Sequence, residues 1–255
     1  MSAATLALHQ FRYDQKVFWR NPASVFFTVM FPVIFMVIFN LIFGNDYIEE
    51  LSLNTSTYYV PAIITLAVVG ATTQSLAINL TQDREAGLLK RVRGTPLPPT
   101  AFVAGRVGNS LVVSVLMVVL VAVLGRVAYG VGLPTETIPG ILVTLAVGAF
   151  AFSCLGFALT TVIPSADAAP AVTNAAVLPL YFISGVFIPE SEIPQGVLHV
   201  ADLFPIRHFF EAFFTAWDPA TSGAGIEWGD LAIVAGWGLA GLAIALWRFR
   251  WEPRR

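Results

Sequence analysis

Charged side chains that could take part in chemistry or recognition are concentrated in one segment, residues 81–99. This segment contains the group Asp83, Arg84 and Glu85, followed by Lys90, Arg91 and Arg93. Only 12% of the chain is charged, so such a density is unusual here. Charges of both signs next to long apolar runs indicate a surface that contacts another molecule in water.

Two histidines are each followed three residues later by an acid, namely His199 by Asp202 and His208 by Glu211. On a helix this spacing would place each pair on one face, and imidazole with carboxylate is a donor set that binds metal ions. Such two-residue coincidences are common in a loop of this length. We therefore expect a solvated interfacial helix there and predict no metal site.

Familiar catalytic motifs are missing from the sequence, which has no G-x-x-x-x-G-K-[ST], H-E-x-x-H, G-x-S-x-G or CxxC. The chain thus lacks a P-loop for nucleotide, and its single cysteine, Cys154, excludes an intrachain disulfide. We predict no catalytic residues and no cofactor bound to this chain. Ion-coupled carriers keep ionisable groups near the membrane midplane. Because Arg106 and Asp167 lie at the edges of apolar runs, the sequence argues against an ion-coupled carrier.

The composition indicates an integral membrane protein, since 56% of the residues are hydrophobic and the mean hydropathy is +0.75. A spanning helix needs about 20 mostly apolar residues, and continuous runs of that length argue against a barrel. The predicted fold is all-α, with six transmembrane helices. Their expected ranges are Val25–Gly44, Tyr58–Leu80, Val107–Tyr129, Ile138–Ile163, Ala169–Ile188 and Trp228–Trp247.

Basic residues predict the orientation of these helices. All of the 14 lysines and arginines except Arg126 and Arg207 precede the first span, lie between the second and third, or follow the sixth. By the positive-inside rule, residues 81–99 and both termini are cytoplasmic. Acidic residues of the opposite loops, including Asp46, Glu49 and Glu50, agree with this orientation.

The whole chain, residues 1–255, is predicted to form a single membrane domain. Residues 1–22 resemble an interfacial amphipathic helix, with Ala4, Leu8, Phe11 and Phe18 toward the headgroups, and show no cleaved signal peptide. The external segment 189–227 carries aromatic residues at helical spacing, so we expect it to fold back over the outer mouth of the bundle.

Two helical faces stand out within the spans. Phe27, Phe31, Phe35, Phe39 and Phe43 form an i+4 ridge along the first span, which either faces lipid or packs against a second subunit or an apolar substrate. In the sixth span, Ala232, Gly236 and Ala240 predict a face for close helix packing.

Three stretches of the sequence resemble the permease subunits of ATP-binding-cassette exporters of the second type, the ABC-2 group of bacterial drug, lipid and polysaccharide exporters. The first is Arg20-Asn21-Pro22 before span one, and the second is DREAGLLKR followed by Gly94-Thr95-Pro96. The third and most specific is LPLYFISGVFIP at 178–189, continuing to Phe204-Pro205. The match in order and spacing covers nearly the whole chain.

The resemblance implies a coupling helix that docks into a groove of a separate ATPase, two copies of which bind ATP and Mg. Its residues here would be Asp83, Arg84, Glu85, Gly87, Leu88 and Leu89, with Lys90, Arg91 and Arg93 as headgroup anchors and Pro164–Ala168 as a lesser contact. It also implies a homodimer or heterodimer of permease chains. The seam and translocation path would contain Phe27, Phe31, Phe35, Phe39, Leu178, Tyr181, Phe182 and Gly185, and segment 189–227 would form re-entrant helices.

The function that the resemblance implies is export of an amphipathic drug-like or lipidic compound across the bacterial cell membrane, with membrane lipids and the ATPase as partners and no nucleic acid. One alternative is a permease for polysaccharide or a lipid-linked glycan, although the spans contain few polar side chains beyond Thr72, Thr73, Gln74, Asn79, Asn174 and Ser184. Another is a membrane scaffold that binds an ATPase without moving substrate.

Overall fold

The structure is a computed structural model that describes residues 3–43, 47–48, 53–249 and 251–252. For residues 3, 23, 24, 27, 43 and 48 it describes the backbone alone. Asp46, Glu49 and Glu50, and the side chains of Phe27 and Phe43, therefore lie outside the described part.

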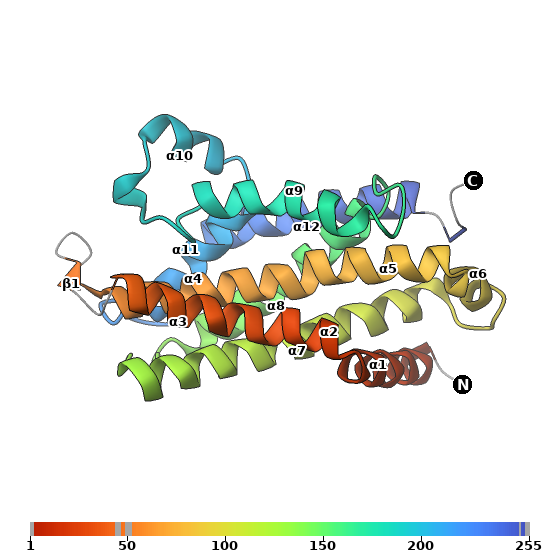
Figure 1. Ribbon diagram of the computed structural model, residues 1–255, viewed down its shortest axis with the longest axis horizontal. Coiled ribbons are helices and arrows are strands. Elements are labelled where there is room, and N and C mark those ends of the chain that lie inside the picture. Colours follow the sequence, from red (N-terminus) through yellow and green to blue (C-terminus); the bar gives the residue numbers. More distant parts are fainter. Residues whose placement is uncertain (1–2, 44–46, 49–52, 250, 253–255) are drawn as a thin grey trace.

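Helices make up most of the described chain. They form an elongated bundle in which α1, α6 and the end of α12 lie at one end, and α10 with a short hairpin at the other (Figure 1). The elements are α1 (Ala3–Arg20), α2 (Pro22–Val25), the π-helical η1 (Phe26–Met30), α3 (Phe31–Phe43), β1 (Tyr47–Ile48), β2 (Leu53–Asn54), α4 (Thr55–Val69), the π-helical η2 (Gly70–Gln74), α5 (Ser75–Glu85), α6 (Leu88–Arg93), α7 (Pro99–Tyr129), α8 (Ile138–Leu159), α9 (Ala169–Ile183), the 3-10 helix η3 (Glu190–Glu192), α10 (Gln195–Ala201), α11 (Pro205–Trp217) and α12 (Trp228–Arg248). Strands β1 and β2 pair antiparallel, with Tyr47 opposite Asn54.

Each of the six predicted spans overlaps a helix, although the fourth ends at Leu159 instead of Ile163. Among the described residues, four helices are long and apolar enough to cross a membrane: 55–85, 99–129, 138–159 and 228–248. The other two apolar helices, Thr28–Ile42 and Ala169–Ile183, are shorter. The expected fifth span to Ile188 is too long, because α9 ends at Ile183 and Gly185 adopts a left-handed φ of 84°.

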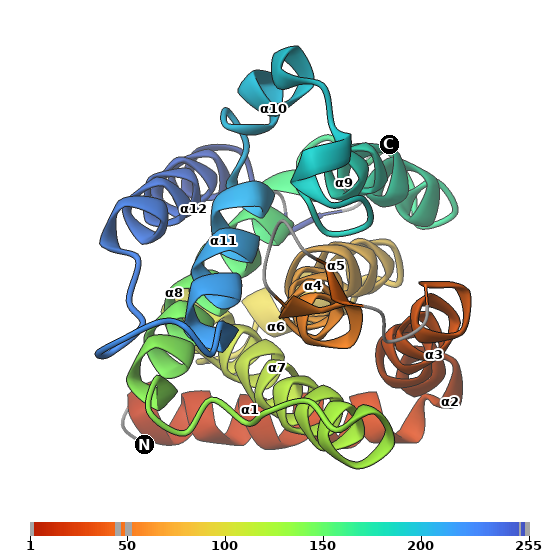
Figure 2. The ribbon, with the colours of Figure 1, turned by 90° about the vertical axis from the view of Figure 1, so that its left-hand side faces the viewer.

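The helix formed by α4, η2 and α5 lies at the centre of the bundle (Figure 2). Every residue of α4 except Thr57 is buried, including Tyr59, Ile63 and Val68. Such a helix has no polar face, as expected for a segment surrounded by other helices. Helices α3, α7 and α11 pack around this central helix.

Helix α1 lies across the end of the bundle rather than along it (Figure 2). It packs on α7 at Gly105, where an added Cβ would lie 2.7 Å from Gln10 Cγ. This position fits an interfacial helix, but the expected lipid face is wrong in part. Phe18 is buried in the protein core and Phe11 contacts Gly108, while Leu8 is exposed.

The close packing of α12 uses a different face from the predicted one. Ala232, Gly236 and Ala240 are exposed, whereas Gly238 and Gly241 lie against α8. A Cβ on Gly238 would lie 2.7 Å from Ala151 Cα. Several small residues occur in α12, and their spacing alone does not indicate which of them meet α8.

Helix α11 is buried beside α4, α8 and α12, so this part of segment 189–227 packs against the bundle. Phe209, Phe210 and Phe213 are inaccessible to solvent. Phe209 fits so closely against α8 that a Cβ on Gly148 would overlap its ring, at 1.9 Å from Cε2.

Candidate functional site

The charged segment 81–99 begins as the last turn of the central helix. Asp83, Arg84 and Glu85 belong to α5, and the chain then turns at Gly87, whose φ is +70°. Glycine is the residue that most readily ends a helix in this left-handed conformation. The short helix expected around residues 83–89 is therefore misplaced: it is α6, Leu88–Arg93, and it contains Lys90, Arg91 and Arg93.

Arg84 points into the protein. It is buried, and its Nη1 and Nη2 donate hydrogen bonds of 2.9 Å to the carbonyl oxygens of Thr160 and Ile163. Thr160 is at the carboxyl end of α8, where helix carbonyls lack partners within the helix and attract positive charge, and Ile163 lies in the turn that follows. Arg84 thus attaches the end of α5 to the turn between α8 and α9.

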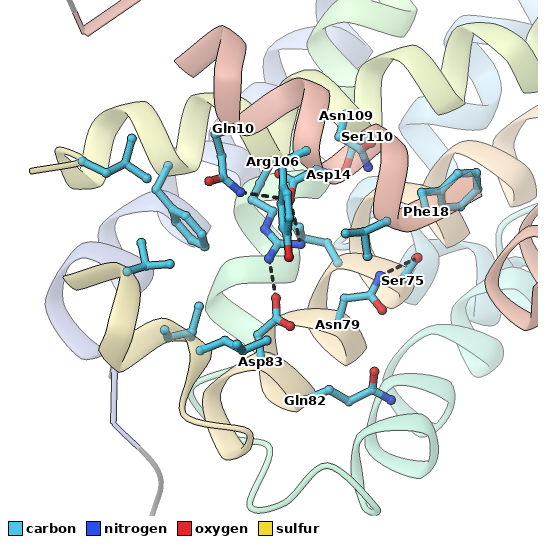
Figure 3. A pocket seen from close by; sticks show the side chains of 18 of the residues that line it. Gln10, Asp14, Phe18, Ser75, Asn79, Gln82, Asp83, Arg106, Asn109 and Ser110 are labelled. Atoms are coloured by element: carbon cyan, nitrogen blue, oxygen red, sulfur yellow. Dashed lines mark hydrogen bonds and ion pairs between the residues drawn. The ribbon is translucent and has the colours of Figure 1, made fainter. Parts of the chain in front are cut away.

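Asp83 attaches the same end of α5 to α7. Its carboxylate pairs with Arg106 Nη2, and Arg106 Nη1 lies 3.5 Å from Asp14 Oδ1 in α1 (Figure 3). Burial raises the pKa of Asp14, and the charge of Arg106 and a hydrogen bond from Gln10 act to lower it. One guanidinium therefore connects α1, α5 and α7.

The remaining side chains of the predicted coupling residues divide into exposed and buried ones. Glu85 and Leu88 are exposed and Gly87 is partly so. Leu89 is buried in an apolar cluster with Leu80 and Phe102. The surface available to a partner is therefore made by Glu85, Leu88 and the basic side chains of α6.

Part of the phenylalanine ridge packs within this chain. Phe35 stacks on Phe187 at a centroid distance of 5.7 Å, and Phe39 stacks on Tyr59 at 4.8 Å. Phe187 also contacts Tyr181 and Phe182 at the end of α9. An intrachain aromatic cluster thus joins α3, α4 and the segment after α9.

The other predicted seam residues include an exposed group on one flank of the molecule. Phe31, Leu178 and Phe182 are 39%, 39% and 52% exposed. Their helices, α3 and α9, lie on the same side of α4 (Figure 2). Tyr181 and Gly185 are buried instead; Tyr181 donates a hydrogen bond to the carbonyl of Leu66, and Tyr58 donates one to that of Gly185.

The histidine pairs predicted in the external segment are not arranged as metal ligands. His208 Nδ1 lies 2.7 Å from Asp230 Oδ1, and Nε2 lies 2.9 Å from the carbonyl oxygen of Asp202. Across the part of the chain that the structure describes, no group of three or more His, Cys, Asp or Glu side chains is placed to hold a metal ion.

Glu211 is the most perturbed acid outside the spans. Burial, together with a hydrogen bond and repulsion from Glu190, raises its pKa to about 9, and Arg207 opposes the shift. Arg207 itself contacts Glu190 at 2.9 Å and Asp202 at 2.7 Å. Arg207 thus pairs with Glu190, which in turn lies beside Glu211.

Sequence reasoning missed the partners of the charged segment. Asp14 was not singled out, although a lone acid in a basic helix is a signal for an internal ion pair. Arg84 could not be recognised as buried, because its acceptors are backbone carbonyls that any residue provides. Phe187 belongs to the quoted LPLYFISGVFIP stretch, but its contact with Phe35 depends on the fold.

Comparisons with known proteins identify the family of this chain. Residues 8–216 match the family model described as "ABC-2 type transporter". A putative transport permease of Bacillus subtilis, YvfS, is 24% identical over 168 residues, covering 66% of this chain and 66% of the relative. The inner membrane transport permease YhhJ of Escherichia coli is 29% identical over 187 residues, covering 69% of this chain and 48% of the relative. The chain thus spans 66% and 48% of the lengths of these two relatives, and it belongs to the ABC-2 type transporter family.

Proposed function

We propose that this chain is the membrane-spanning subunit of an ATP-driven exporter, paired with a second permease chain and with two copies of a separate ATPase. The observation that carries the proposal is the family match over residues 8–216 of a chain without a P-loop. The energy for transport would come from ATP and Mg on the ATPase.

In this proposal six helical segments cross the bacterial cell membrane. Residues 22–43 form one run of helix through α2, η1 and α3, which at ~1.5 Å per residue is about 30 Å long. The α9 segment is shorter, and the buried turn after it would complete its crossing. The ends that carry α1, α6 and most of the basic residues would be cytoplasmic, and α10 and α11 would form the external re-entrant segment.

The ATPase would bind at Glu85 and Leu88, beside the exposed basic side chains of α6. Movement of the ATPase would pass into the bundle through two attachments, from Asp83 to Arg106 and from Arg84 to the end of α8. Rigid elements with two packing arrangements are the usual basis of such switching.

The exposed flank of α3 and α9 supports the proposed substrate class. Its large side chains, including Phe31, Ile34, Leu178 and Phe182, are apolar or aromatic. A path along this flank suits an amphipathic drug or a lipid, because apolar surfaces bind apolar groups without leaving polar groups unpaired. Polar contacts on it are few, an example being Gln74 with Asn174.

The test replaces Leu88 by Asp and Glu85 by Ala in permease embedded in nanodiscs, and measures the affinity of the purified ATPase. We expect Leu88→Asp to weaken binding at least about tenfold, since a buried charge at an interface centre is costly. Glu136→Ala, an exposed acid at the opposite end, is the matched control. Unchanged affinity and unchanged lipid export in both variants would refute the docking surface.

A further inference from the structure

A cavity of about 580 Å³ lies between α1, α5, α6 and α7 (Figure 3). No residue of α3 or α9 lines it, so it is distinct from the flank proposed for transport. Its size is in the range of cavities that hold small organic molecules.

Three buried polar atoms of residues that line this cavity lack hydrogen-bond partners among the described residues: Asp14 Oδ2, Asn109 Oδ1 and Arg106 Nε. The Asp14 side chain is 2% exposed, and only its other oxygen is used, accepting from Gln10 Nε2 at 2.9 Å. Buried polar groups are nearly always paired, so unpaired ones point to an occupant. Two of the three atoms are acceptors, and one of these carries charge.

The charges around the cavity favour a cation. Asp14 and Asp83 share the single guanidinium of Arg106, with Asp83 in close contact and Asp14 at 3.5 Å. This leaves one carboxylate incompletely neutralised in a buried place. Arg91 also lines the cavity, but its side chain is exposed to water, which screens it.

The rest of the lining is largely apolar, with Leu6, Val17, Leu76, Phe102 and Val113 from three different helices. An occupant that satisfies both parts of the lining has a hydrocarbon body and a head that donates hydrogen bonds and carries positive charge. A primary ammonium meets these requirements, because it has three donors and no acceptor.

We propose that this cavity binds the primary ammonium head of an amphipathic molecule, with Asp14 Oδ2 as the acceptor that recognises it. The ligand would contact α1, α5 and α7, the three helices that Arg106 connects, and would strengthen that junction next to α6. The ammonium can come from a free amphipathic amine or from an ethanolamine lipid headgroup.

The experiment measures binding to permease in phosphatidylcholine nanodiscs at neutral pH, with binding to empty nanodiscs subtracted. Dodecylamine is compared with dodecanol, which has the same chain and no charge. We expect the amine to bind at least about tenfold more tightly, since hydrogen bonds to charged groups are worth about 1.5–3 kcal/mol. Asp14→Asn should abolish this preference, and Asp167→Asn, an exposed acid outside the cavity, should retain it.

A second pair of probes identifies the source of the ammonium. Lysophosphatidylethanolamine is compared with lysophosphatidylcholine, which lacks ammonium hydrogens. Tight binding of dodecylamine assigns a free amine, and preference for the ethanolamine lipid alone assigns a headgroup. Equal affinities within both pairs on the unchanged protein would overturn the proposal, whether or not Asp14→Asn folds. Because no ATPase is present, this outcome leaves the transport proposal unaffected.

Discussion

Arg84 belongs to the charged segment 81–99, yet its side chain is buried and makes contacts inside the protein. It donates to the carbonyl of Thr160, which caps α8, and to that of Ile163, which holds the turn before α9. A buried guanidinium with two such bonds is a strong and directional contact. The nearby residues Glu85 and Leu88 are exposed, so they are accessible to a partner, whereas Arg84 is not.

Replacing Arg84 by Met is expected to lower stability by about 2 kcal/mol, because two carbonyl groups lose a charged donor. For a chain of this size this corresponds to roughly 4–8 °C in Tm. The measurement is thermal unfolding in detergent, with Arg93→Met, an exposed arginine of α6, as the control. Equal Tm values for the two variants would contradict the capping role.

Glu211 makes the stability of the folded protein depend on pH. Its pKa is raised to about 9 in the folded protein from an ordinary value of 4.5. The folded state therefore holds a proton that the unfolded state has released between these values. The stability from this group is complete below about pH 4.5 and declines as pH rises, until it is lost above about pH 9.

We expect Tm to fall between pH 5 and pH 9 and expect Glu211→Gln to flatten this dependence, because the amide keeps the shape of the protonated acid without titrating. Thermal unfolding across this pH range measures the effect. Glu136→Gln, which removes an exposed acid, should leave the slope unchanged. A wild-type Tm that is constant or rises over this range would disprove the assignment.

At the scale of elements, glycines set how closely helices approach. Gly105 brings α1 onto α7, and Gly108, three residues later in the same helix, has more space, with Phe11 Cδ2 at 3.5 Å from a built Cβ. The two positions therefore form a matched pair. Alanine has a higher helix propensity than glycine by about 1 kcal/mol, so any loss at Gly105 must come from the contact with α1.

Gly105→Ala should destabilise the protein and increase proteolysis within α1, whereas Gly108→Ala should be neutral or stabilising. The measurement combines Tm with protease cleavage of the N-terminal helix in nanodiscs. If the protease cleaves α1 no faster in Gly105→Ala than in Gly108→Ala, the close approach at Gly105 is not needed to hold α1.

Across the whole molecule, much of the helical arrangement could be predicted because hydrophobic runs report which segments avoid water. The runs do not report where a helix ends. The sequence predicts a separate short helix for residues 83–89, yet Asp83–Glu85 continue α5 to the turn at Gly87. The sequence also does not indicate which face of α12 packs, since it contains both Gly236 and Gly238 and only Gly238 contacts α8.

The exposed flank of α3 and α9 makes a prediction about assembly. In a background with Cys154→Ala, Phe182→Cys should crosslink to its own copy in membranes if two chains meet at this flank. Leu246→Cys, on the exposed side of α12, should not, because α12 lies across the central helix α4 from α3 (Figure 2). Crosslinking only through Leu246→Cys would place the contact on the other side of the molecule, and crosslinking with an unrelated permease would indicate a heterodimer.

The attachments of Asp83 and Arg84 also restrict how α5 can move. Successive helix residues point about 100° apart, and these two hold neighbours on different sides of the helix, α7 through Arg106 and the end of α8. Rotation of α5 about its own axis would break one contact or the other, whereas tilting it together with α7 and α8 would break neither. We therefore expect a force applied at α6 to tilt α5, α7 and α8 together, and we expect α5 not to rotate about its own axis.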